Sequence, residues 1–277
     1  STERGEMRYP IHKDAEGRWV HTWVRQSSVK TSDMCLERWR RDVFDTQPEV
    51  IKDASMLGTV CHKVAEDVLL SAIDYFHGYT DVEMTEADAM QAFGDEWEMK
   101  HPTIEVWNSY DSPDAAGEQG RLRLKSWFDE VLPDLTPLQV EHRFEVPLIE
   151  DAERVVYLRG TIDLVEGDRL WDWKFPKRDY SRDAWQYHRW DVQSAAYCYA
   201  MGIENFSYRI MHPGGVGSID LVRTQVHYDW LRAKVLALCQ LLENQTGAYP
   251  LGDNGWWCSD KWCDYFARCK GATIGGT

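Results

Sequence analysis

The sequence has no long apolar run and no secretion signal. None of its segments reaches the roughly 18 consecutive apolar residues that a transmembrane helix requires. Its first residues lack the basic, apolar and small-residue regions of a signal peptide. The seven cysteines are an odd number, and without a secretion signal they do not predict a disulfide framework. These absences favour a cytoplasmic protein in a reducing setting, without membrane contact.

Positive charge is also scarce. There are 31 Lys and Arg against 46 Asp and Glu, and the formal net charge is −15. Such a balance argues against tight, non-specific binding to duplex nucleic acid. The acidic surplus is concentrated, however, because Gly78 to Glu118 holds eleven acidic residues and one lysine, a local charge of −10. The remainder carries only about −5, which leaves room for a basic surface elsewhere.

The composition is that of a folded protein, with 43% hydrophobic and 13% aromatic residues. Apolar residues at helical spacing predict helices over 33–44 and 55–76, then one opening at 85 and one opening at 113. The pattern then changes to period two, which predicts strands over 140–148, 155–165 and 169–175. A helix over 183–201, strands over 206–211 and 219–226, and a helix over 230–242 follow. We therefore expect an α/β fold.

The domain organisation expected from these elements is simple. Residues 1–25 are expected to be a flexible start. Residues 26–270 are expected to form one domain, which includes a helical region over 55–133 and a cysteine-rich tail over 254–270. Residues 271–277 contain glycines and are expected to fray. No repeat or low-complexity linker marks a boundary inside the domain.

The stretch from Gly160 to Lys174 reads as a β-hairpin with two acids facing each other. Gly167-Asp168 is a Gly-X pair that suits a two-residue turn. That loop pairs Asp163 with Asp172 across the ladder, where like charges are destabilising. A divalent cation between them would remove the repulsion. Lys174 follows Asp172 by two residues and so lies on the same face.

This arrangement predicts a site for Mg²⁺ or Mn²⁺, since hard cations take oxygen ligands. A neutral His62, from the helix over 55–76, could add a further ligand. The alternative is a surface hairpin in which Asp172 and Lys174 form an ordinary ion pair and His62 is structural. Trp171 and Trp173 favour the metal site, because they imply a buried setting in which a charged face is costly.

Four motifs together resemble the PD-(D/E)xK nuclease superfamily, in its RecB-like branch, which includes CRISPR-associated iron–sulfur exonucleases. The motifs are Gly58-Thr59-Val60-Cys61-His62, Gly160-Thr161-Ile162-Asp163, Asp172-Trp173-Lys174 and Gln193-Ser194-Ala195-Ala196-Tyr197. The resemblance covers residues 32–269. It implies a restriction-endonuclease-like core, in which helices flank a mixed central sheet, preceded by a helical region.

The resemblance also implies roles for individual residues. His62, Asp163 and Asp172 would be metal ligands, with the carbonyl of Trp173 as a further one, and Lys174 would be the catalytic lysine. Gln193 and Tyr197 would line the DNA strand and support Lys174; they lie four apart and share a helix face. Glu141 or Glu145 would add a carboxylate, and the sequence does not choose between them.

Four of the cysteines form a second group. Cys258, Cys263 and Cys269 cluster in the tail, and Cys35 lies far upstream. Four thiolates suit either an iron–sulfur cluster or Zn²⁺, and unligated thiols are the third possibility. The resemblance implies a structural [4Fe–4S] cluster, although the first gap in the tail is two residues longer than the usual C-x2-C-x5-C. Cys61, Cys198 and Cys239 lie on apolar helix faces and are expected in the core.

A basic and aromatic run follows the hairpin. Its cations are Lys177, Arg178, Arg182 and Arg189, interleaved with aromatic residues. Cations meet phosphates and aromatic rings stack on unpaired bases, so the run predicts a surface for single-stranded nucleic acid. The alternative is a solvated loop and helix start.

The combined expectation is a metal-dependent DNA exonuclease acting on single-stranded ends, in recombination, repair, replication or phage DNA metabolism, in a bacterium or a phage-infected host. Its partners would be DNA and either a second copy or recombination or CRISPR proteins. Two alternatives stay open: a DNA-end processing module of a CRISPR-adaptation-like complex, and a non-enzymatic zinc or iron–sulfur DNA-binding protein.

Overall fold

The computed structural model describes residues 10–44, 50–183, 187, 189–244, 249–252, 255, 257–260 and 262–269. The expected flexibility of residues 1–9 and fraying of residues 271–277 concern positions outside these ranges. No helix within the described ranges combines the length and the hydropathy that crossing a bilayer demands.

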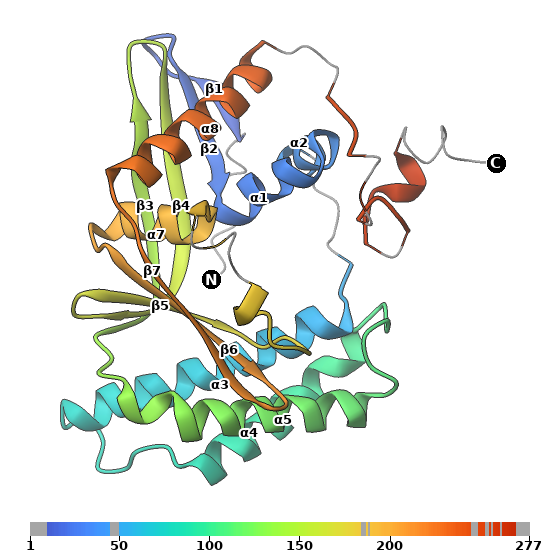
Figure 1. Ribbon diagram of the computed structural model, residues 1–277, viewed down its shortest axis with the longest axis vertical. Helices are drawn as coiled ribbons and strands as arrows, with labels where there is room; N and C mark the ends of the chain where they lie inside the picture. Colours follow the sequence, from blue (N-terminus) through green and yellow to red (C-terminus); the bar gives the residue numbers. More distant parts are fainter. Residues whose placement is uncertain are drawn as a thin grey trace. The chain divides into compact units, whose positions relative to one another are not determined.

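The fold is α/β, as the sequence predicts (Figure 1). The helices are α1 (Gln26–Met34), α2 (Leu36–Phe44), α3 (Asp53–Phe76), α4 (Glu86–Lys100), α5 (Pro113–Glu130), α7 (Val192–Met201) and α8 (Gln225–Glu243). The strands are β1 (Ile11–Lys13), β2 (Trp19–Arg25), β3 (Gln139–Glu150), β4 (Arg154–Glu166), β5 (Arg169–Lys174), β6 (Asn205–His212) and β7 (Gly215–Val222).

The strands form a mixed sheet of restriction-endonuclease-like type. Hydrogen bonding connects them in the order β1-β2-β4-β5-β6-β7, and β3 also pairs with β4. The β2–β4 and β5–β6 pairs are parallel, whereas β1–β2, β4–β5 and β6–β7 are antiparallel. The parallel β5–β6 pair requires a crossover, which α7 supplies.

The chain divides into two compact units, where the sequence led us to expect one domain. The first unit draws on Ser1–Pro48, Arg143–Gly160 and Gln225–Thr277, and the second on Glu49–His142 and Thr161–Thr224. Strands β3 and β4 contribute residues to both units, so no linker separates them in the sequence. This is why composition shifts could not reveal the division.

The first unit contains β1, β2, the first part of β4, α1, α2 and α8. Residues 11–13 and 19–25 are strands, the second of them over the aromatic patch Trp19–Val24. Strand β2 runs parallel to β4 and buries Val20, Trp23 and Val24. The burial of these large apolar side chains outweighs the polar character of the segment.

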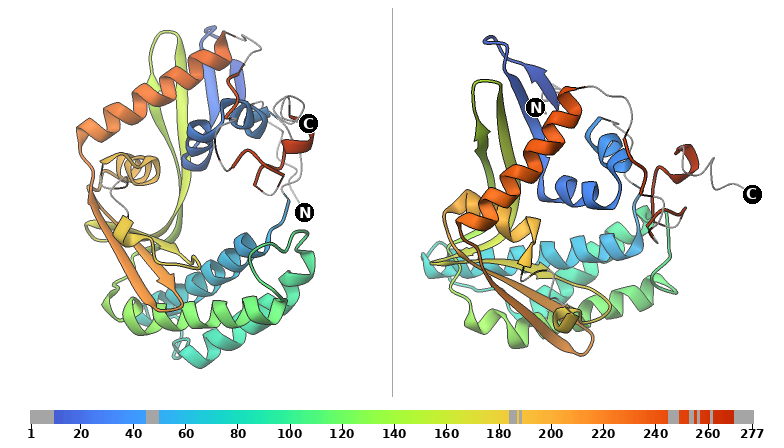
Figure 2. Two further views of the ribbon diagram at one scale, coloured as in Figure 1. Left: turned by 45° about the vertical axis from the view of Figure 1, so that its right-hand side comes forward. Right: turned by 45° about the horizontal axis from the view of Figure 1, so that its top comes forward.

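The second unit packs α3, α4 and α5 together, and its core also takes side chains from β4 and β5 (Figures 1 and 2). Thr85 forms the capping box that opens α4, and Ser112 caps α5. Gly120 allows α4 and α5 to approach closely, because a Cβ there would clash with the Phe93 ring. Trp127 of α5 meets Trp173 of β5 edge to face, 6.0 Å between ring centres.

Two boundaries differ from the sequence prediction. Helix α7 begins at Val192 rather than at 183, because Asp191 caps it by accepting a hydrogen bond from the Ser194 backbone N–H. Strand β7 ends at Val222, and α8 begins at Gln225, five residues earlier than predicted. The Asp191 cap sets the start of α7, and the pairing of Val222 with Asn205 sets the end of β7.

Candidate active site

The β4–β5 hairpin has the predicted register, in which Glu166 pairs with Arg169, Val165 with Leu170 and Leu164 with Trp171. Gly167 has a φ of +43°, the left-handed conformation that a tight turn needs and that glycine adopts without strain. Beyond Leu164 the Asp163 carboxylate accepts a hydrogen bond from the Trp173 backbone N–H at 2.7 Å. The hairpin therefore places Asp163 and Asp172 on adjacent strands of the second unit.

Three side chains of the second unit could share one cation. Ligand atoms of His62, Glu141 and Asp163 lie within 4.8 Å of one another, and His62 Nδ1 is 3.4 Å from an oxygen of Asp163. His62 comes from α3, Glu141 from β3 and Asp163 from β4. Two carboxylates and one imidazole are a donor set that suits a divalent cation. The same three residues line a pocket with Ser55, Thr59 and Glu66 of α3.

Glu141, and not Glu145, is the acidic residue of β3 at this position. Its φ is +47°, a conformation that costs an ordinary side chain energy and that persists only where the surroundings enforce it. Glu145 belongs to the first unit, where it forms an ion pair with Arg159 at 2.7 Å. The backbone distortion at Glu141 left no sign in the sequence, so the two glutamates could not be distinguished there.

Asp172 is held by two neighbours rather than by the three potential ligands. Its carboxylate is 2% exposed, lies 2.7 Å from Lys174 Nζ and accepts a hydrogen bond from the side-chain amide of Gln193. The oxygen that faces Lys174 makes no hydrogen bond of good angle with any described residue. The Lys174 ammonium is therefore the charged group that balances this buried oxygen.

Burial and neighbouring charges shift the pKa values of the ionisable groups at the site. Burial raises the pKa of Asp163, and the nearby Asp172 charge raises it further. Burial and then the charge of Asp163 raise the pKa of Glu141 to about 7. Burial lowers the pKa of His62, so its imidazole is neutral and able to bind a metal. A divalent cation would relieve the repulsion between the carboxylates, so the residues present fit the metal that the sequence predicts.

Lys174 remains charged within this group. Burial acts to lower its pKa, but the carboxylates of Asp172 and Asp163 more than offset that effect, and the net shift is upward. Its ammonium also lies 5.7 Å from the centre of the Tyr208 ring. Lys174 is therefore a donor of hydrogen bonds and not a base.

A buried network supports Asp172 from α7 and β6. Gln193 donates to Asp172, and the Tyr208 hydroxyl, which donates to Asp191 at 2.7 Å, lies 3.3 Å from the Gln193 amide oxygen. Tyr197, the other residue of the predicted pair, packs against Phe206 with 6.1 Å between ring centres. Sequence reasoning missed Tyr208 and Asp191; the only available signal was the N-cap spacing of Asp191 and Ser194.

The predicted nucleic-acid cations Lys177, Arg178, Arg182 and Arg189 are all exposed. Lys177 and Arg178 line a common hollow, together with Tyr110. The ammonium of Lys177 lies 4.5 Å from the centre of the Tyr110 ring. Trp185 and His188 of the same run lie outside the described residues.

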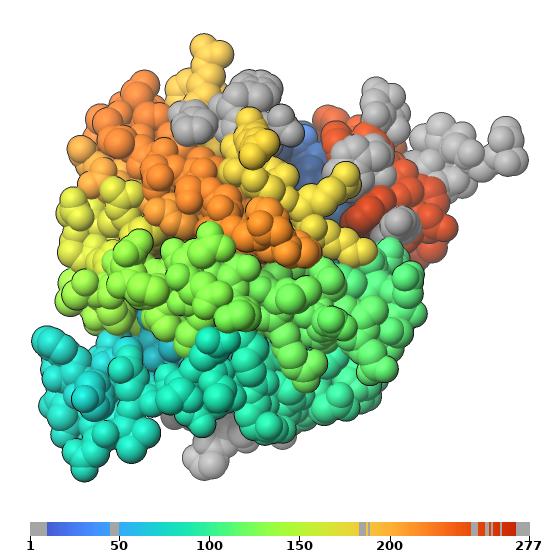
Figure 3. Space-filling model, turned by 60° about the horizontal axis from the view of Figure 1, so that its bottom comes forward, coloured from blue at the N-terminus to red at the C-terminus, as the bar shows by residue number. Residues whose placement is uncertain are grey.

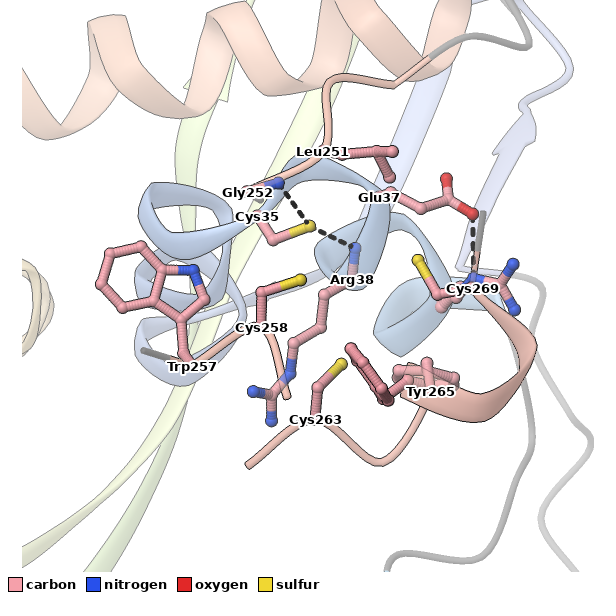
Figure 4. Close-up of a pocket in the computed structure, with 12 residues that line it drawn as sticks. Cys35, Glu37, Arg38, Leu251, Gly252, Trp257, Cys258, Cys263, Tyr265 and Cys269 are labelled. Carbon is pink, nitrogen blue, oxygen red and sulfur yellow. Dashed lines mark hydrogen bonds and ion pairs between the residues drawn. The ribbon is translucent and has the colours of Figure 1, made fainter. Parts of the chain in front are cut away.

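The four cysteines predicted as ligands lie around one small cavity of the first unit (Figure 4). Cys35 is an extended residue between α1 and α2, not part of a first helical turn as predicted. Its sulfur accepts hydrogen bonds from the backbone N–H of Arg38 at 3.4 Å and of Gly252 at 3.3 Å. Cys258, Cys263 and Cys269 approach from the tail, and Arg38 donates to the Trp262 carbonyl.

The other three cysteines, Cys61, Cys198 and Cys239, are fully buried on helices, as expected. Burial raises the pKa of Cys61 to about 12, which keeps its thiol protonated. These three are core residues and not ligands.

Comparison with known proteins places this geometry in context. A family model described as the PD-(D/E)XK nuclease superfamily matches residues 24–270. No curated protein matches the sequence. Among solved structures, the chain is similar to the crystal structure of SSO0001, with 13% identity over 87% of this chain and 96% of that one and a TM-score of 0.38. It is also similar to LHK-Exo in complex with dAMP, with 12% identity over 70% and 88% and a TM-score of 0.35.

Proposed function

Because the chain belongs to the PD-(D/E)XK nuclease superfamily, we propose that it is a Mg²⁺- or Mn²⁺-dependent DNA exonuclease that acts on single-stranded ends. The observation that carries the proposal is the convergence of His62, Glu141 and Asp163 beside the Asp172–Lys174 pair. We call these five residues the carboxylate site. We place the protein in DNA recombination, repair, replication or phage DNA metabolism.

The cation, when bound, would lower the pKa of a water molecule and offset charge on the phosphodiester. His62, Glu141 and Asp163 would hold it, and Asp172 would be the further carboxylate ligand that the family resemblance implies. The Trp173 carbonyl is the further ligand that the family resemblance implies. Gln193 fixes the orientation of Asp172 through its amide.

Lys174 acts on the substrate side. Its ammonium is charged and can donate a hydrogen bond to the oxygen on which negative charge develops, and it can orient the attacking water. A metal-activated water would attack the phosphodiester directly, without a covalent intermediate. Tyr197 would contact the DNA strand. The exposed cations of the segment after β5, which are Lys177, Arg178, Arg182 and Arg189, would contact it as well.

We also propose that Cys35, Cys258, Cys263 and Cys269, here called the thiol site, hold a structural [4Fe–4S] cluster. Tetrahedral zinc with bonds of about 2.3 Å would bring the sulfurs to roughly 4 Å from one another. The thiols form no such tight group, since the set of ligand atoms found within 4.8 Å among the described residues is that of His62, Glu141 and Asp163. A cluster of four separated irons suits the wider spacing.

The test is digestion of end-labelled single-stranded DNA by the anaerobically purified protein with Mn²⁺. Lys174→Ala and Asp172→Ala should each lower the rate by at least about 100-fold with the fold intact. Lys125→Ala, at a lysine of the same unit that is half exposed and paired with Glu86 and Asp129, should leave the rate unchanged. Full activity in either site variant would contradict the proposal.

An ultraviolet-visible spectrum of the same preparation tests the thiol site. A broad visible absorption band is expected for a [4Fe–4S] cluster. A colourless protein that contains one equivalent of zinc would contradict the cluster and indicate a zinc site instead. A purified chain that binds single strands without cleaving them would instead support the DNA-end processing module that works only with partner proteins.

A further inference from the structure

A hollow of about 650 Å³ opens in the second unit, close along the chain to Lys174. One wall is the loop before α5, with Ser109 and Tyr110, and the first turns of α5, with Glu118 and Gln119. The other wall is the segment after β5, with Lys177 and Arg178. Figure 3 shows this segment (yellow) beside the start of α5 (green).

The first wall is fixed by a buried carboxylate. Asp53, at the start of α3, is fully buried and accepts hydrogen bonds from the backbone N–H groups of Asn108, Ser109 and Tyr110, at 3.1, 2.7 and 2.8 Å. Charge-assisted bonds of this kind are stronger than ordinary ones. The loop is therefore held in one conformation before any ligand arrives, which reduces the entropy lost on binding.

The second wall is tied to the first by Arg123 of α5. This side chain is 1% exposed and donates to the Phe175 carbonyl at 3.0 Å, while its guanidinium lies 5.8 Å from the centre of the Tyr110 ring. Its Nε and Nη2 have no hydrogen-bond partner, and it forms no ion pair with a described carboxylate. Arg123 therefore fixes the segment after β5 against the loop before α5, and the cations that line the hollow itself are Lys177 and Arg178.

We propose that this hollow holds the nucleotide next to the scissile phosphodiester and favours a base that carries an exocyclic amino group. The inference rests on the proposed nuclease function. Lys177 and Arg178 are exposed and can bind the phosphate. Lys177 follows Lys174 by three residues, on the order of 10 Å at full extension, so the bound nucleotide is a close neighbour of the cleaved bond.

The base preference follows from the two carboxylates of the hollow, Asp111 and Glu118. They would repel a simple anion, but they accept hydrogen bonds from amino groups such as N4 of cytosine or N6 of adenine. The amide of Gln119 can both donate to and accept from the same base edge. Thymine has no exocyclic amino group and leaves these acceptors without a donor.

The test uses single-stranded oligonucleotides that carry a thymine, a cytosine or an abasic position at each site flanking the cleaved bond. At one position, wild-type kcat/KM should fall about tenfold for thymine relative to cytosine, and at least as far for the abasic position. Glu118→Gln and Gln119→Ala should remove the discrimination while cleavage continues. Gln91→Ala, an amide on the neighbouring helix α4 that pairs with Asp95, should retain it.

Equilibrium binding of the same oligonucleotides to Lys174→Ala protein gives a readout that does not depend on cleavage. A wild-type chain that cleaves but shows the same base preference in both hollow variants would overturn this inference and leave the nuclease function standing. A chain that does not cleave would overturn the nuclease function. The base preference measured by equilibrium binding would then test the base selectivity of the hollow by itself.

Discussion

The carboxylate site and the thiol site differ in the secondary structure that carries their residues. The acids and His62 lie on β3, β4, β5 and α3, whose ladders and core fix them before any ion binds. The thiols lie on an extended residue between two short helices and on a tail whose only described regular element is the turn Phe266–Arg268. The comparison indicates that a site on regular elements is held by the fold, and under the proposed function we expect the thiol site to depend on the cluster that it binds.

Cys263→Ala separates the two sites most sharply. We expect the loss of one cluster ligand to lower the melting temperature by at least about 5 °C, because bound metal contributes directly to folding. Differential scanning calorimetry of anaerobic protein measures this. Asp172→Ala should show no comparable fall, and an unchanged melting temperature in Cys263→Ala would remove the structural role of the thiol site.

Glu141→Gln tests whether the carboxylate site has been assigned to the correct acid. We expect about tenfold weaker Mn²⁺ binding by isothermal titration calorimetry, since a ligand charge is lost. Glu145→Gln is the matched control on the same strand. It breaks the exposed ion pair with Arg159 and should leave the affinity unchanged. The reverse result would assign the ligand role to Glu145, four residues further along β3.

Gly252→Ala probes the thiol site without removing a sulfur. A Cβ at this position would clash with the Met34 carbonyl and lie 2.9 Å from Cys35 Cβ, so the segment must move and its N–H···S bond to Cys35 is lost. We expect less iron per chain and a shifted visible spectrum. Gly94→Ala, where the Cβ would meet only the end of the Arg121 side chain, should bind iron normally.

The smallest expected effect is a pH dependence in the first unit. His21 Nε2 lies 2.9 Å from a Glu243 oxygen, and its Nδ1 accepts a hydrogen bond from the Trp23 indole N–H. Burial lowers the pKa of His21 and outweighs the opposing effect of Glu243. Its contribution to stability is therefore present above about pH 6.5, the unfolded value, and is lost as pH falls through the lower folded pKa. Thermal unfolding of wild type and His21→Gln between pH 5 and 8 should show a steeper acid loss in wild type.

The sequence predicted the parts of the carboxylate site that depend on local pattern. A turn signal and alternation predicted the pairing of β4 with β5 from Glu166–Arg169 to Leu164–Trp171, beside Asp163 and Asp172, and helical periodicity placed His62 on α3. Long-range contacts had no such signal. Tyr208 lies on β6 next to Gln193, and β6 pairs in parallel with β5, while β2 pairs with both β1 and β4.

At the thiol site, too, the sequence did not predict the local backbone conformation. The family resemblance implied that the four cysteines would meet, and they line one cavity. The sequence could not predict that the chain breaks its helix at Cys35, because the residues on either side of that position are compatible with one continuous helix. The approach of Gly252 to that break is equally invisible to periodicity.

The left-handed backbone at Glu141 has a consequence for how this family can vary. A position with φ of +47° admits glycine, asparagine and aspartate with little strain and resists β-branched residues. The backbone conformation at position 141 therefore restricts which amino acids can replace the glutamate, in addition to the need for a carboxylate under the proposed function. We expect inactive relatives that have lost the acid to carry asparagine or glycine at this position, not the valine or isoleucine typical of a strand. Such a substitution would serve as a marker for lost catalysis in sequence data.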